Sequence, residues 1–156
     1  DACYLSSFKL LAMLDPDSTF SYDNFMLLNS KSASNNTFFG TQSSYDASVS
    51  SGRLTYFGND ELSNEIGKIY SHHYYRIHYN GELLDKTYFR ELPILVTGAL
   101  SNKAKIRQEN TKIIKTHTYI TEVQLKEEIQ RFYILRCNAG VDQIKKVIQM
   151  LNEELN

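Results

Sequence analysis

Cysteine and tryptophan are scarce in this sequence of 156 residues, which contains two cysteines and no tryptophan. Cys3 and Cys137 lie far apart and in no metal-type spacing, so they exclude a disulfide scaffold and leave at most one bridge, whose formation stays open. The aromatic content is nevertheless high, because the chain has 11 tyrosines and 8 phenylalanines. A tyrosine can line the edge of a core with its ring while its hydroxyl stays in water.

Long apolar runs and an excess of one charge are also absent. No run of about 18 apolar residues occurs, so this chain alone does not cross a membrane, and no signal-peptide pattern is present. The formal net charge is -1, which gives no basic field to attract nucleic acid or an anionic membrane, so we expect no nucleic-acid partner. The first residue is Asp1 rather than methionine, and we expect a processed N-terminus.

The residues that are present predict one ordered helical domain, 1–156. Hydrophobic residues make up 42% of the chain and charged residues 22%, both close to the average of globular proteins. No alternating strand pattern of convincing length occurs, whereas apolar residues recur at steps of three and four. We therefore expect an all-α fold, namely an antiparallel helical bundle with a long C-terminal helix. The first helix is predicted at 2–14, with one face made of Leu5, Phe8, Leu11 and Ala12.

The stretch 43–62 is typical of a short helix that ends, a connector, and the beginning of a second helix. Gly52 follows a short helix at a place where left-handed backbone is needed, so we predict a positive φ there. Asn59 is placed to cap the next helix with its side-chain oxygen. That helix continues through a segment rich in histidine and tyrosine. Asn80-Gly81 within it is interpreted as a local irregularity or as a break between two helices.

The last third predicts the longest helix, from Glu122 to Leu155. Thr121 and Gln124 match a capping box at its start. Gly140 lies in mid-helix, at a cost of about 1 kcal/mol relative to alanine, so a close neighbour is expected there. The predicted inward stripe consists of Ile129, Phe132, Ile144, Val147, Ile148 and Leu151. The segment before this helix, 98–118, carries several lysines and is compatible with a loop that contains a short helix.

The segment 70–80 contains the most prominent cluster of potential metal ligands in the sequence, namely His72, His73 and His78. A metal site on a helix needs ligands three or four residues apart, and His78 lies five and six residues from the other two. Neither HExxH nor paired cysteines occur. We therefore expect no metal and no cofactor, and interpret these residues as an aromatic and polar helix surface with one histidine turned towards the core.

Signatures of catalysis are also missing. Glu127-Glu128 and Glu153-Glu154 are adjacent pairs that point to different sides of a helix, and no GxSxG, GxGxxG or GxxxxGK[ST] motif occurs. Cys137 lies in an apolar-rich helix, where an inert buried thiol is expected. The lysines between 103 and 115 are expected to be solvated. The chain is therefore predicted not to be an enzyme.

The order of several motifs resembles an uncharacterised family of small bacterial single-pass membrane proteins. The shared places are Tyr45, Ser50-Ser51-Gly52, Leu54, Asn59-Asp60, Leu62 and Tyr74-Tyr75, together with the terminal QIKKVIQMLNEEL. In that family a charged stretch and one transmembrane helix precede a helical extracytoplasmic domain of unknown function. The resemblance implies a domain on the periplasmic side, held by an N-terminal anchor that would lie outside this chain.

Three functions follow as expectations. The first is a non-enzymatic, membrane-tethered domain that contacts a protein partner or another copy of itself. The second is a small-molecule sensor lined by the tyrosines and histidines from Tyr70 to Tyr79, since helical bundles can hold ligands between helices. The third is a hydrolase that depends on histidine or metal. Residues expected to contact a ligand or partner are His72, His73, Tyr74, Tyr75, Arg76 and His78.

Overall fold

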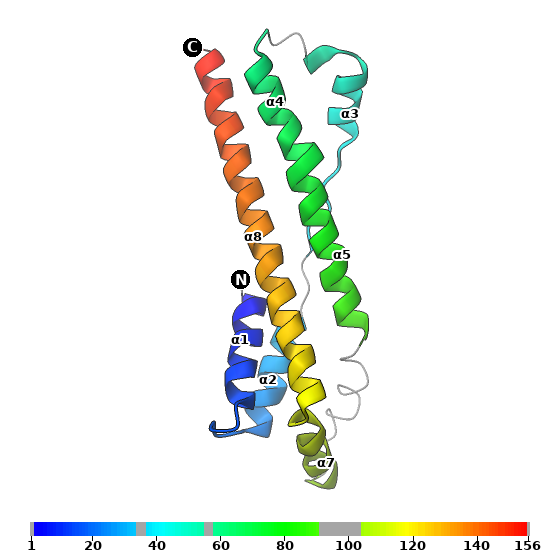
Figure 1. The fold of residues 1–156 in the computed structure, drawn as a ribbon, viewed down its shortest axis with the longest axis vertical. Helices are drawn as coiled ribbons and strands as arrows, with labels where there is room; N and C mark the ends of the chain where they lie inside the picture. Colours follow the sequence, from blue (N-terminus) through cyan, green and yellow to red (C-terminus); the bar gives the residue numbers. More distant parts are fainter. Residues whose placement is uncertain (1, 34–36, 55–57, 91–103, 156) are drawn as a thin grey trace. The chain divides into compact units, whose positions relative to one another are not determined.

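The fold is all-α in the computed structural model, which describes residues 2–33, 37–54, 58–90 and 104–155 (Figure 1). No β-strand occurs in these ranges, and the predicted fold class is confirmed. The contacts group the chain into two compact units, unit 1 (1–36 and 82–132) and unit 2 (37–81 and 133–156). Helices α5 (Tyr75–Arg90) and α8 (His117–Glu154) contribute residues to both units. The single domain over 1–156 stays a prediction.

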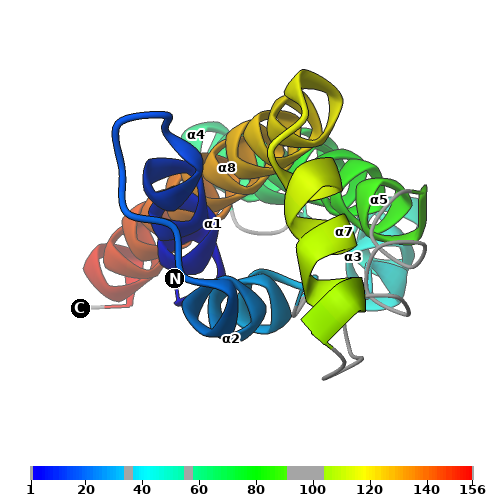
Figure 2. The same cartoon turned by 90° about the horizontal axis from the view of Figure 1, so that it is seen from below.

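Unit 1 contains α1 (Ala2–Leu14), α2 (Tyr22–Ser32), α7 (Ala104–Ile114) and the first part of α8. Helices α1 and α2 lie side by side (Figure 2). Ser21 begins α2, because its side chain accepts a hydrogen bond from the Asn24 backbone N–H, as helix N-caps do. The buried core of this unit consists of Leu10, Leu14, Phe25, Ile114, Tyr119 and Val123.

Helix α1 buries a different face from the predicted one. Its buried residues are Ser6, Ser7, Leu10 and Leu14. Leu5 and Phe8 are exposed by 52% and 57%, and Ala12 is exposed as well, whereas Leu11 packs at the edge of the core. The Ser6 hydroxyl donates to the Ala2 carbonyl oxygen at 2.7 Å, so this polar group is satisfied inside its own helix. A pattern that counts only apolar residues therefore selected the wrong side.

Unit 2 contains α3 (Ser43–Ser50), α4 (Asp60–Lys68), the π-helical turn η2 (Ile69–Tyr74), the start of α5 and the last part of α8. Helix α4 runs beside the end of α8 (Figure 1). The two helices are antiparallel: Asn59, at the start of α4, donates to the carboxylate of Glu154, at the end of α8, at 2.8 Å. Leu62, Ile69 and Val147 form the buried core of this unit.

Two of the expected helix boundaries in unit 2 are confirmed. The Asn59 side-chain oxygen accepts from the Leu62 backbone N–H at 3.0 Å and caps α4. Gly52 has a φ of +69°, and Gly58, which was not singled out, has a φ of +64°. Asn80-Gly81 does not break the helix, since α5 continues through it. The irregular turn lies earlier, at η2.

Helix α8 is the longest described helix, as predicted, but it begins at His117 rather than at Glu122. The capping box at Thr121 and Gln124 was wrong, because both residues lie inside the helix. The cap is made instead by Thr116, whose hydroxyl accepts from the Tyr119 backbone N–H at 3.3 Å. Within the preceding segment 98–118, α7 begins at Ala104, and residues 98–103 lie outside the described residues.

The buried side of α8 is only partly the predicted stripe. Val147 is buried, but Phe132 and Ile148 are exposed. Buried residues on α8 are Tyr119, Val123, Lys126, Gln130, Tyr133, Gly140 and Val147. Gly140 has the close neighbour that was expected, because a Cβ built on it would lie 3.0 Å from Ile77 Cδ1. Cys137 and Cys3 do not form a disulfide.

Candidate functional site

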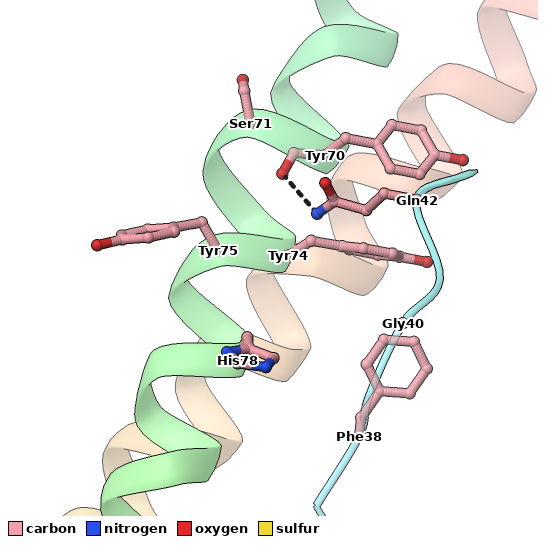
Figure 3. A pocket seen from close by; sticks show the side chains of 8 residues that line it. All are labelled: Phe38, Gly40, Gln42, Tyr70, Ser71, Tyr74, Tyr75 and His78. Carbon is pink, nitrogen blue, oxygen red and sulfur yellow. Dashed lines mark hydrogen bonds between the residues drawn. The ribbon is translucent and has the colours of Figure 1, made fainter. Parts of the chain in front are cut away.

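The candidate site lies in unit 2, where an irregular segment passes along η2 and the first turn of α5 (Figure 3). We call residues 37–42 the strap. The Phe38 ring meets the Tyr74 ring edge-on, with centroids 5.5 Å apart, and the Phe39 ring meets His78 in the same way at 5.7 Å. The Phe38 backbone N–H donates to the Tyr133 hydroxyl at 2.6 Å. The strap is thus held by aromatic contacts and one hydrogen bond to α8.

Gly40 allows the strap to lie against the aromatic side chains. A Cβ built on Gly40 would collide with the Tyr74 ring and would lie 2.9 Å from Phe38 Cε1. Contacts below 3.0 Å force something to move, so any larger residue would push the strap and the Tyr74 ring apart. The absence of a side chain at Gly40 therefore allows the close approach of the strap to the Tyr74 ring.

The π-helical turn supplies the backbone of the opposite wall. Such turns are often found at functional sites, because they shift the hydrogen-bond ladder of the helix. The Gln42 amide nitrogen donates to the Tyr70 carbonyl oxygen at 3.4 Å (Figure 3). The Tyr70 ring stacks on the Tyr45 ring of α3, with centroids 4.2 Å apart and planes 12° from parallel. Together these contacts attach the strap and α3 to the turn.

Between the strap and the helix lies a pocket with a volume of about 230 Å³. It is lined by Phe38, Gly40, Gln42, Tyr70, Ser71, Tyr74, Tyr75 and His78. None of these residues is Asp, Glu, Lys or Arg. Aromatic side chains in and near the lining are exposed: Tyr75 by 65%, Phe39, whose ring meets His78, by 58%, and Tyr79, which follows His78 in the sequence, by 49%. The site is therefore an aromatic depression with one histidine in its lining.

Only part of the predicted contact set lies at this pocket. Tyr74, Tyr75 and His78 line it, whereas His72, His73 and Arg76 do not. The rings of His72 and His73 meet edge-on with centroids 5.1 Å apart. Burial, followed by the nearby charges of His72 and Arg136, lowers the pKa of His73. Within the described ranges, no group of three or more His, Cys, Asp or Glu side chains is arranged to hold a metal ion.

The strap residues were missed by sequence reasoning. Phe38, Gly40 and Gln42 stand in a polar, serine-rich stretch, from which the sequence singled out no site residue. A usable signal was present, because two adjacent phenylalanines followed by glycine are unusual in such a stretch. That signal could not indicate the partner, since Tyr74 lies more than 30 residues further along the chain.

Unit 1 holds a second group of polar side chains, buried between α1, α2 and α8. The Gln130 amide nitrogen donates to the Ser32 carbonyl oxygen at 3.2 Å and lies 3.8 Å from Cys3 Sγ. One turn earlier on α8, burial lowers the pKa of Lys126 to about 8, and the nearby Cys3 opposes this shift. Burial also raises the pKa of Tyr119 well above its ordinary value. These groups belong to the core and form no open site.

The fold and the pocket define an all-α protein with an aromatic surface site. The chain belongs to a Family of unknown function (DUF6090), which matches residues 12–126 and so includes the strap and every residue of the pocket. Comparison with curated proteins and comparison with solved structures each give no match. In the described residues, no helix is both long enough and apolar enough to cross a membrane.

Proposed function

We propose that this chain is a non-enzymatic binding domain that contacts another protein through the aromatic surface of unit 2. We define this surface as Phe38, Phe39, Tyr75 and Tyr79 around the pocket. The observation that carries the proposal is the large exposure of these four rings in one unit. Aromatic residues are enriched in protein–protein interfaces, and tyrosine is among the residues enriched at the few positions that dominate the binding energy.

The size of the pocket favours a protein partner over a drug-sized ligand. Small-molecule sites usually measure about 300–1,000 Å³, and this pocket measures about 230 Å³. A depression of this volume accommodates one side chain of a partner, while the surrounding rings contact its neighbours. The strap, which carries Phe38 and Phe39, is also held in place. Gly40 packs closely against the Tyr74 ring, and the Phe38 backbone N–H donates to the Tyr133 hydroxyl.

A small-molecule sensor is the second candidate function. The pocket is lined by Tyr70, Tyr74, Tyr75 and His78, all from the segment expected to line such a site, and Gln42 and Ser71 add hydrogen-bonding groups. A small, neutral ligand would suit this lining. Thermal melting of the purified chain with a library of small neutral compounds tests this candidate, and a saturable rise in melting temperature that Tyr74→Ala removes would support it.

The subcellular location of the domain is also part of the proposal. From the family resemblance we infer a bacterial membrane anchor outside these 156 residues and a position on the periplasmic side. Protease added to intact spheroplasts of the producing cells tests this inference. Digestion of the domain before lysis would support a periplasmic position, and protection until lysis would contradict it.

Site-specific photo-crosslinking tests the binding function. A photoreactive phenylalanine analogue replaces Tyr75 in the full-length protein in its own cells. The matched control places it at Asp142, an exposed position of the same unit whose side chain is 76% accessible. We expect one discrete adduct from position 75, lost on Phe39→Ser, and none from 142. An adduct of twice the chain mass would identify self-association, and equal smears from both positions would contradict the proposal.

A further inference from the structure

The walls of the pocket favour a flat ring as the occupant. Its lining has no Asp, Glu, Lys or Arg, and much of it consists of the aromatic residues Phe38, Tyr70, Tyr74 and Tyr75. A flat ring suits such walls because aromatic rings pair favourably edge-on or offset.

Gln42 adds a directional requirement. Its amide nitrogen is engaged by the Tyr70 carbonyl oxygen, which leaves the amide oxygen as an acceptor on the pocket wall. A ring that carries an N–H donor can use this acceptor. Among side chains, the uncharged indole of tryptophan combines a large flat ring with one donor, and tryptophan is prominent among interface hot spots.

From these observations, and resting on the proposed function, we infer that the pocket receives one tryptophan side chain of a partner protein. The indole ring lies against Phe38 and Tyr74, and its N–H donates to the Gln42 side-chain oxygen. The partner is a protein that exposes a tryptophan, and residues 1–156 themselves contain none.

Titration with N-acetyl-tryptophanamide tests the inference directly. Because the chain has no tryptophan, the fluorescence of the added indole can be followed without background from the protein. We expect saturable binding with a dissociation constant on the order of millimolar, as suits one isolated side chain. In amide NMR spectra, the shifts should concentrate at Gly40, Gln42 and Ser71.

Matched ligands and variants distinguish binding at this site from nonspecific binding of the indole. The 1-methylindole analogue lacks the donor and should bind roughly fivefold or more weakly, and the difference should vanish in Gln42→Leu. N-acetyl-lysinamide should not bind. Tyr74→Ala should lose binding, with circular dichroism to confirm its helical content. Equal affinity for the indole and its methyl analogue, or shifts spread over the whole surface, would overturn the inference.

The two proposals fail in different ways. A specific crosslink at position 75 without indole binding would leave the binding function standing and overturn the tryptophan assignment. Indole binding at Gln42 without any crosslink would keep the pocket assignment for a small indole-containing ligand, overturn the tryptophan-bearing partner and contradict the protein-binding function.

Discussion

The side-chain amide of Gln143 on α8 donates to both the backbone carbonyl oxygen and the carboxylate of Glu65 on α4, at 3.0 and 2.7 Å. Lys68 and Lys146 approach the other carboxylate oxygen at 2.7 and 2.9 Å. Hydrogen bonds from Lys68, Gln143 and Lys146 lower the pKa of Glu65 to about 2, against the opposing effect of burial. A buried carboxylate thus links the two antiparallel helices of unit 2.

This link predicts an acid-sensitive stability. Since the folded pKa of Glu65 lies below its ordinary value of 4.5, its contribution is present above pH 4.5 and is lost as the pH falls towards 2. Urea denaturation at stepped pH should show a decline in the free energy of unfolding over this range. The decline should be smaller in Glu65→Gln than in Glu61→Gln, an exposed control on the same helix. Equal slopes in the two variants would contradict the role of Glu65.

The buried Lys126 predicts the opposite dependence at alkaline pH. Its folded pKa of about 8 lies below the ordinary 10.5, so the unfolded chain binds the extra proton and stability rises with pH above 8. The rise should end near pH 10, where Tyr119, whose pKa burial raises, begins to favour the unfolded state. Lys126→Met should abolish the rise and add roughly 1 kcal/mol or more at neutral pH. Lys145→Met, at an exposed position of α8, is the control for both effects.

Two glycines of unit 2 should respond to alanine with opposite signs. At Gly52 the left-handed φ of +69° disfavours any Cβ, although no atom lies within 4 Å of it, so Gly52→Ala should destabilise by about 1 kcal/mol or more. Gly67 lies inside α4, and an added Cβ would make an ordinary contact with the Tyr45 hydroxyl at 3.5 Å. Gly67→Ala should therefore stabilise, by up to about 1 kcal/mol. Chemical denaturation measures both, and a loss of stability in both would refute the conformational argument.

The histidines are predicted to bind no stoichiometric zinc at near-neutral pH. His78 lines the pocket beside Phe39, whereas the rings of His72 and His73 meet each other outside it. Zinc needs nitrogen ligands that converge within about 2.0–2.1 Å of one point. Calorimetric titration of chelator-treated protein should show no one-to-one site of micromolar affinity. Such a site, lost in both His73→Ala and His78→Ala, would raise the metal-dependent hydrolase above the binding domain.

Local features of the sequence were enough to establish the helical class and several boundaries. Helical spacing predicted α4, α5 and α8, because 3.6-residue periodicity is a property of the segment itself. The left-handed Gly52 and the Asn59 cap depend on the conformational freedom of one residue and on one side-chain hydrogen bond, so they too could be inferred locally. Three members of the pocket, Tyr74, Tyr75 and His78, were found for the same reason, as an aromatic run on one helix.

Tertiary packing decided which faces are buried and where the pocket is closed. Ser6, Lys126 and Gln130 are buried in the core of unit 1, although apolar periodicity assigns polar residues to the surface. Hydrogen bonds of Ser6 and Gln130 offset the cost of burying these two side chains, and such bonds cannot be inferred from periodicity. The strap reaches Tyr74 only because Gly40 has no side chain, and this contact joins segments that are distant in the chain. A pattern within one segment carries no information about such a contact, which depends on how two surfaces fit once both are folded.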